Sequence, residues 1–236
     1  MPEVGYQEVH LPRAFARLGY EVKVFTSDAS VNLGGEMNQL NYKGGLSKDE
    51  KYKYDILRLP SLSFKSKAYS FGLKKAIFEF NPDVLIILGV AKIFPLPLLN
   101  DDFYTKIKMV SVYGDAKEYL DRGTFKQKLK TAFHELGYRL IKEPLYRKAV
   151  KFNHRLVMNI PETNEFFLSF LKGKDKLLFE QKRQMLTLGF DPDEYFFSET
   201  DRKQRRNELG FNEDDIVIIT STRVNKRKNL EKNIKL

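Results

Sequence analysis

Residues 81–88 constrain the fold more than any other part of the sequence. Asn81-Pro82-Asp83 breaks a helical pattern, and Val84–Leu88 follows at once as the apolar run VLIIL. A continuous apolar run of this length, without polar alternation, is typical of a parallel strand buried on both faces. Parallel strands need crossover connections, which are usually helices. We therefore expect a parallel sheet with helices packed on its faces.

Other apolar runs along the chain alternate with helical patterns. Strands are predicted at 21–26, 55–59, 84–88, 108–113, 155–158 and 216–220. Amphipathic helices are predicted at 11–18, 69–80, 125–150 with a break at Pro144, and 202–209. Asn159 and Glu162 have the spacing of a capping box, which predicts a further helix start, and 28–53 is predicted to be a long mobile loop. The alternation predicts an α/β fold of Rossmann-like parallel sheets with right-handed crossovers.

The composition narrows the class of protein. The chain of 236 residues contains no cysteine, which excludes disulfides and thiolate metal sites. Its histidines, His10, His134 and His154, show no paired ligand spacing, so we expect no metal. No apolar run approaches the roughly 18 residues that span a bilayer, and no signal segment opens the chain. We therefore expect a cytoplasmic protein.

The net charge is the strongest compositional signal. Lysine and arginine number 41 against 31 aspartate and glutamate residues, which gives a formal charge of +10. Such a surplus favours anionic partners, namely nucleic acid, phosphorylated small molecules or the anionic face of a membrane. Lysines also solubilise a surface, so a purely solvating role of this charge stays open.

The order of elements is incomplete for a doubly wound sheet. The pattern opens on a loop and a helix with no strand before them, and it ends within a helix just after a new strand begins. A sheet of this kind normally starts on a central strand. We therefore expect a fragment that is truncated at both ends.

Four stretches occur in an order that resembles one large enzyme family. They are GYQE at 5–8 leading into LGYEVKVFT at 18–26, NPDVLI at 81–86, LTLGFDPDEYF at 186–196, and RRNELG at 205–210 followed by IVII at 216–219, TR at 222–223 and KN at 228–229. In this order and spacing they are similar to the motifs of the GT-B glycosyltransferases, in particular the retaining family-4 type. The resemblance covers nearly the whole chain.

The resemblance implies two Rossmann-like domains. Residues 1–190 would form the acceptor-side domain without its first strand, and 191–236 the linker and the beginning of the donor-binding domain. The implied reaction transfers a sugar from a nucleotide-diphosphate sugar to a hydroxyl of a sugar or lipid-linked acceptor, with retention, in the synthesis of cell-surface polysaccharides or glycoconjugates. No metal or other cofactor is implied, and no nucleic acid is expected as a partner.

Two further expectations follow from the family. Its carboxylate motif that contacts the donor sugar would lie beyond Leu236, so the chain by itself is expected to be inactive. Many relatives act on lipid-linked acceptors, which is compatible with peripheral association at the inner face of the membrane.

Arg223 and Lys228 are the candidate ligands of the donor diphosphate. Both lie in the loop between the apolar run at 216–220 and a last helix predicted to start near Asn229, where α/β sheets bind ligands. Fixed cations there stabilise the negative charge that develops on the leaving diphosphate, and the resemblance implies the same contact. A solvated basic loop is the alternative, because Lys226 and Arg227 lie between them.

Gly5, Gln7 and Glu8 are the candidates for the acceptor cleft. Gly5 would let backbone amides approach a substrate closely, and Gln7 and Glu8 follow it at the start of the first helical stretch. An ordinary turn glycine is the alternative reading of Gly5.

Tyr113 and Asp115 are the candidate catalytic residues. With Gly114 they end a predicted buried strand at its carboxyl edge. Many members of the family have a histidine at the position of Tyr113, which contacts the donor sugar. Tyrosine can form a hydrogen bond there but cannot carry a proton near neutral pH, whereas Asp115 can bind or deprotonate an acceptor hydroxyl. A strand-end turn is the alternative.

Two other functional classes stay open. A nucleic-acid-binding α/β protein would explain the charge, although the sequence has no recognisable helix-turn-helix, RNA-binding or zinc pattern. A non-catalytic fragment that binds a protein partner or an anionic membrane surface is the other.

Overall fold

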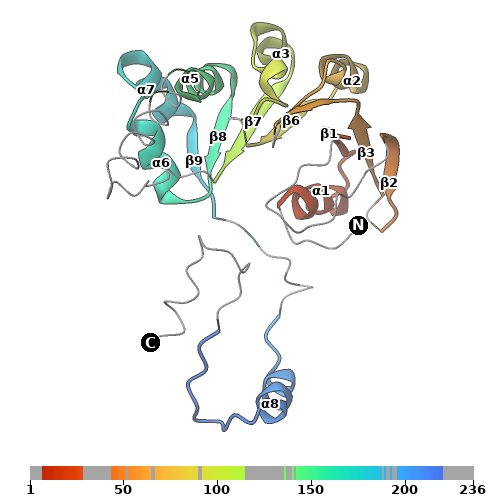
Figure 1. The fold of residues 1–236 in the computed structure, drawn as a ribbon, viewed down its shortest axis with the longest axis vertical. Coiled ribbons are helices and arrows are strands. Elements are labelled where there is room, and N and C mark those ends of the chain that lie inside the picture. Colours follow the sequence, from red (N-terminus) through yellow and green to blue (C-terminus); the bar gives the residue numbers. More distant parts are fainter. Residues whose placement is uncertain are drawn as a thin grey trace. The chain divides into compact units, whose positions relative to one another are not determined.

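The structure is a computed structural model and describes residues 7–28, 44–51, 53–64, 67–89, 92–114, 136, 140, 142–187, 189, 192 and 196–219. The chain divides into two compact units, Met1–Gly189 and Phe190–Leu236. Figure 1 labels most of the helices and strands of the two units.

The larger sheet of the first unit has four parallel strands (Figure 1). They are β6 (Val84–Leu88), β7 (Lys108–Tyr113), β8 (Arg155–Met158) and β9 (Arg183–Met185), side by side in sequence order. Ile87 lies opposite Ser111, and Tyr113 lies opposite Met158. Because the strands are parallel, their carboxyl ends lie at one edge of the sheet. The predicted α/β class is therefore confirmed.

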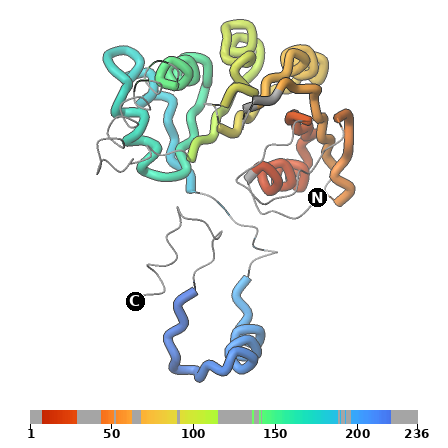
Figure 2. The backbone as a smooth tube through the Cα atoms, in the orientation of Figure 1, coloured from red at the N-terminus to blue at the C-terminus, as the bar shows by residue number. Residues whose placement is uncertain are grey.

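Helices connect these strands, as the backbone tube in Figure 2 shows. The 3-10 turn Leu96–Leu98 and α3 (Asp101–Lys106) lead into β7, and α5 (Glu143–Phe152) leads into β8. α6 (Pro161–Leu168) and α7 (Gly173–Lys182) lead into β9. Pro144 lies in the first turn of α5, where its fixed φ suits a helix start and its missing N–H costs nothing.

α5 and α7 pack side by side and run in the same direction. At the ends of the two helices, Lys182 Nζ donates to the carbonyl oxygens of Val150 and Lys151, each at 3.0 Å. Near their beginnings, the Arg147 guanidinium donates to the carbonyl oxygen of Phe170 at 3.1 Å, three residues before α7 starts. The positive ends of both helix dipoles therefore lie on the same side.

One face of the parallel sheet carries the core. Met109, Ser111 and Tyr113 of β7 are at most 1% exposed, and they alternate with Val110 and Val112, which are half-buried. Successive strand residues point to opposite faces, so the first three side chains share the face covered by α5, α6 and α7. Burial of one face only explains why the strand alternates in exposure.

An aromatic cluster fills the space between this face and its helices. The ring of Tyr113 lies edge-on to Phe167 of α6 at 4.9 Å between centroids. Phe167 also contacts Tyr146 of α5 at 5.1 Å and stacks on Phe179 of α7 at 5.0 Å. Such pairs contribute about 0.5–1.5 kcal/mol each beyond the area they bury. The end of β7 is thereby fixed to three helices at once.

A buried chain of hydrogen bonds connects β7 to the end of α5. Ser111 Oγ donates to Asn153 Oδ1 at 2.6 Å, and Asn153 Nδ2 donates to the carbonyl oxygen of Ala149 at 2.8 Å. All three residues are fully buried. Buried polar groups are tolerated only when their hydrogen bonds are made, so this chain specifies the position of the α5 end over the sheet.

A smaller sheet precedes the larger one in the first unit. β1 (Lys23–Ser27) pairs in parallel with β3 (Tyr54–Leu59), and β2 (Gly45–Asp49) pairs antiparallel with β3. α1 (Gln7–Arg17) comes before β1. The hairpin β4 (Leu62–Phe64) and β5 (Lys67–Tyr69) follows β3 and leads to α2 (Leu73–Phe80).

The two sheets share one hydrophobic core. Leu59 of β3, Leu73 and Ile77 of α2 and Ile87 of β6 belong to the same buried cluster, against which Phe25 of β1 packs. The rings of Phe25 and Phe80 lie 6.0 Å apart. α2 therefore bridges β1 and β6, which are end strands of their sheets among the described residues.

The described part of the second unit is held together by hydrogen bonds rather than by a core. α8 (Glu199–Glu208) begins at Ser198, whose Oγ accepts the N–H of Asp201 at 3.2 Å. Arg206 donates to the carbonyl oxygens of Asn212, Glu213 and Asp215. No residue of α8 is buried, so the helix depends on capping and polar contacts.

Several sequence predictions are confirmed at the level of single elements. The strands at 84–88, 108–113 and 155–158 have the predicted bounds, and β1 and β3 lie within two residues of theirs. α1 and α8 occupy the stretches predicted as helices at 11–18 and 202–209, with earlier starts. The predicted helix at 125–150 lies partly outside the described residues, and its described end is α5.

Three local predictions are wrong. The predicted loop 28–53 contains β2, because Ser47 and its neighbours pair with β3. Tyr69 pairs with Leu62 in the hairpin, and the helix expected from 69 begins only at Leu73. Asn159 is not the N-cap of α6: Ile160 occupies that position without a side-chain cap hydrogen bond, and Pro161 lies in the first turn, a position that suits proline.

Two strand predictions are also corrected. Residues 216–219 form no strand, and Ile216 is 92% exposed, since none of the described strands pairs with them. An isolated strand buries no apolar surface and gains no ladder bonds. The expected burial of β6 on both faces is also wrong within the described part of the chain: Val84 is 52% exposed and only Ile87 is buried, because β6 is an end strand.

Asn153→Ala tests the buried tie between β7 and α5. It removes the partners of the Ser111 hydroxyl and the Ala149 carbonyl, and we expect the free energy of unfolding to fall by about 1–3 kcal/mol. Gln184→Ala, at an exposed amide of β9, is the matched control and should change stability by less than about 0.5 kcal/mol. Urea unfolding measures both. An equal loss in the two variants would contradict the assigned role of Asn153.

Candidate functional site

The carboxyl edge of the parallel sheet is the candidate site, because open α/β sheets bind ligands there. Gly89 follows β6, Gly114 follows β7 and Asn159 follows β8. The Asn159 N–H donates to the carbonyl oxygen of Tyr113 at 2.8 Å, and the Gly89 N–H donates to that of Val112 at 3.2 Å. These bonds extend the ladder and bring the three strand ends together.

Gly89 makes room for a cation at this edge. Its φ of +78° lies in the left-handed region that favours glycine. A Cβ on Gly89 would lie 2.9 Å from Lys92 Cε, so the lysine stem packs directly over the glycine. The Lys92 ammonium is exposed. The end of β6 thus presents a positive charge that could bind an anionic ligand.

Gly114 and Asn159 form the neighbouring part of the edge. A Cβ added to Gly114 would lie 3.6 Å from Asn159 Nδ2, which is ordinary contact. Asn159 offers both a carbonyl oxygen and an amide, so it can accept from a hydroxyl and donate to an oxygen. Together with Lys92, this edge could bind a polar or phosphorylated ligand.

The predicted catalytic residues are Tyr113, the last residue of β7, and Asp115, two residues later in the sequence. Of the two, Tyr113 is among the described residues. Tyr113 is 1% exposed, and its ring packs against Phe167 and Tyr146. This burial gives the ring a packing role, and its catalytic role stays a prediction. Asp115 lies outside the described residues.

The other predicted site residues are largely outside the described part of the chain. Gly5, Arg223 and Lys228 are not among the described residues. Gln7 begins α1, and Glu8 is exposed in its first turn. Their roles in an acceptor cleft and a diphosphate site stay predictions.

Lys92 and Asn159 were not predicted as site residues from the sequence. Asn159 was interpreted as a helix cap. The spacing of Gly89 and Lys92 just after the apolar run is the signal that points to the lysine, since a glycine that follows a parallel strand marks the ligand-binding edge.

Two groups with shifted pKa values lie at the opposite, amino edge. Burial lowers the pKa of Lys182, whose ammonium donates to the last carbonyls of α5. A cation at a helix C-terminus is favourable, so its role is to cap α5. Burial also lowers the pKa of His154, aided by the charges of Lys108, Lys182 and Arg155.

His154 has a structural role as well. Its Nδ1 accepts the N–H of Met109 at 3.1 Å, and its ring stacks on Tyr104 at 4.4 Å between centroids. Nδ1 can accept only when it carries no proton. The neutral imidazole therefore fixes the start of β7.

The described residues offer neither a metal-binding cluster nor a membrane-spanning helix. Within them, no group of three or more histidine, aspartate or glutamate side chains could hold a metal ion. None of the described helices combines the length and apolar character needed to cross a bilayer.

Neither the protein-family models nor the curated proteins against which the sequence was compared give a match.

Acidification should destabilise the protein through His154. Its native pKa lies below the unfolded value of about 6.5, so the unfolded state binds more protons and stability falls as the pH drops below that value. We expect His154→Asn, whose Oδ1 can still accept the Met109 N–H, to reduce the loss of stability between pH 7 and pH 5. Urea unfolding at both pH values measures it, with His10→Asn as the control. Identical pH dependence in wild type and His154→Asn would contradict this role.

Proposed function

We propose that the chain is part of a retaining glycosyltransferase with two Rossmann-like domains of the GT-B kind. In the full-length form it transfers a sugar from a nucleotide-diphosphate sugar to an acceptor hydroxyl. The first unit serves the acceptor and the second begins the donor side. We place the reaction in the cytoplasm, on a sugar or lipid-linked acceptor used for cell-surface polysaccharide or glycoconjugate.

The order of the strands is the observation that carries the proposal. A doubly wound sheet has the strand order 3-2-1-4-5-6. In the first unit, β3 and β1 pair in parallel, and β6, β7, β8 and β9 follow one another in a second parallel sheet. In this proposal, β1 and β3 correspond to strands 2 and 3 of that order, and β6 corresponds to strand 4. The position between β1 and β6 is then that of strand 1. A strand there would join the two sheets, which already share a core through α2.

The carboxyl edge gives this proposal its chemistry. Lys92 at the end of β6 and the Gly114–Asn159 contact beside Tyr113 offer a cation, close backbone approach and amide hydrogen bonds. Those are the groups that a sugar hydroxyl or a diphosphate oxygen needs. Asp115 follows Gly114 and is assigned to the acceptor hydroxyl, and Gly5, Gln7 and Glu8 to the acceptor cleft. Arg223 and Lys228 are assigned to the donor diphosphate, where no metal is required.

Thermal-shift measurements with UDP- and GDP-sugars test the donor assignment in the full-length protein. We expect at least one nucleotide sugar to raise the melting temperature. Arg223→Ala and Lys228→Ala should each weaken its binding by about tenfold or more, since each removes a charge-assisted contact to phosphate.

Lys203→Ala is the matched control, because Lys203 is an exposed cation of α8 that pairs only with Glu213 among the described residues. It should leave the shift unchanged. The absence of a shift with every nucleotide sugar, or a shift that survives both Arg223→Ala and Lys228→Ala, would contradict the donor assignment.

A further inference from the structure

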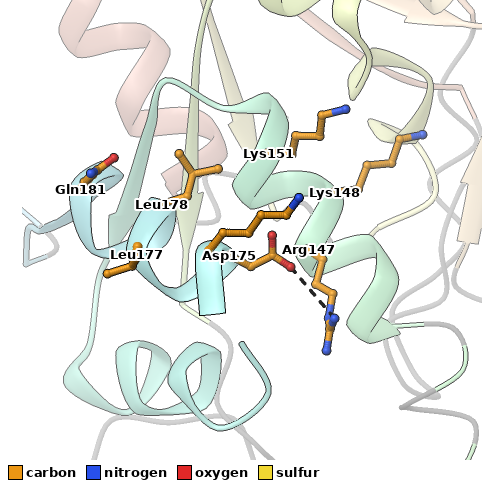
Figure 3. A pocket seen from close by; sticks show the side chains of 8 residues that line it. Arg147, Lys148, Lys151, Asp175, Leu177, Leu178 and Gln181 are labelled. Carbon is orange, nitrogen blue, oxygen red and sulfur yellow. Dashed lines mark ion pairs between the residues drawn. The ribbon is translucent and has the colours of Figure 1, made fainter. Parts of the chain in front are cut away.

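A basic groove of about 580 Å³ lies between α5 and α7 (Figure 3). Its lining includes four cationic side chains, Arg147, Lys148, Lys151 and Lys174. Figure 3 shows Lys148 and Lys151 extending from α5, with Leu177 and Leu178 on the facing helix α7. The groove is separate from the carboxyl edge described above, because it is formed by the helix layer rather than by strand ends.

The positive charge of the groove is largely uncompensated. Asp175 is the one acid among the described residues that line it, and its Oδ2 lies 4.0 Å from the Arg147 guanidinium. Within the described part of the chain, no carboxylate pairs with Lys148, Lys151 or Lys174. The lining therefore keeps a surplus of positive charge that attracts an anion.

The placement of these cations is only partly favourable for the helices: Lys151 lies in the last turn of α5, where a cation is stabilising. Arg147 and Lys151 have the i,i+4 spacing at which like charges destabilise a helix. Lys174 lies in the first turn of α7, at the positive end of its dipole, where Asp175 offsets its charge in part. A bound anion would offset the repulsion between Arg147 and Lys151 and the charge of Lys174.

We propose that this groove binds the phosphate groups of anionic phospholipids and docks the first unit on an anionic membrane surface. Leu177 is 67% exposed beside the cations, and an apolar side chain flanked by lysines suits the boundary between headgroups and acyl chains. None of the described residues that line the groove is aromatic, so they offer no stacking surface of the kind that single-stranded nucleic acid uses. The docking does not depend on the proposed glycosyl transfer.

Vesicle sedimentation tests the proposal with the whole chain. The probes are vesicles of phosphatidylglycerol mixed with phosphatidylcholine, and vesicles of phosphatidylcholine alone. We expect binding to the anionic vesicles only, weakened by salt because the charges are exposed. Lys148→Glu with Lys151→Glu should lower the partition coefficient at least tenfold, given the strength of lysine attraction to such surfaces.

Lys74→Glu with Lys75→Glu is the matched control. Both residues are exposed on α2, so the pair changes the net charge equally but lies outside the groove, and it should retain most of the binding. Leu177→Ser keeps every charge and should also weaken binding, which separates insertion at the interface from simple attraction. Circular dichroism checks that each variant is folded.

Four results would overturn the proposal. They are equal loss of binding in the two double variants, equal binding to phosphatidylcholine vesicles, saturable binding of inorganic pyrophosphate at the groove without binding to anionic vesicles, and tighter binding of an oligonucleotide than of the vesicles through the same lysines. None of them bears on the nucleotide-sugar measurement, so failure here and failure of the proposed function are distinguishable.

Discussion

The burial of one face of β7 is the constraint on which the rest of the first unit depends. Met109, Ser111 and Tyr113 are almost fully excluded from solvent, and a slip of one residue would place valines in the core and these side chains outside. The aromatic contacts of Tyr113 and the Ser111–Asn153 hydrogen bond then fix the helices over this face. Because β7 pairs with both neighbours in parallel, its register also brings Gly89, Gly114 and Asn159 to one edge.

Much of the fold could be predicted from the sequence because its strands are short apolar runs bounded by clear breaks. Val84–Leu88 follows Asn81-Pro82-Asp83, and the left-handed backbone of Asn81 ends α2 as that break predicts. β2 was missed because its sequence GLSKD is polar and exposed, and only its pairing with β3 makes it a strand. The opposite error occurred at 216–219, where apolar residues have strand propensity but no partner among the described strands.

The site was less predictable than the fold for a related reason. A strand end can be recognised from sequence, but its surroundings depend on residues far along the chain: Gly114 contacts Asn159, and His154 supports Met109. The α5–α7 groove is the clearest case, since Arg147 and Asp175 meet only because α5 and α7 run side by side. Charge counting indicated an anionic partner, and the packing of two helices indicates where one could bind.

Hydrogen–deuterium exchange of the full-length protein, with and without a nucleotide sugar that raises its melting temperature, tests the central claim most directly. If the carboxyl edge of the parallel sheet is the site, the ligand should slow exchange in peptides that cover Gly89 to Lys92, Tyr113 to Asp115 and Met158 to Asn159. Peptides at the amino edge, around Asp83 and His154, should be unchanged. Protection confined to the amino edge or to the helix layer, or none within residues 1–189, would contradict the account.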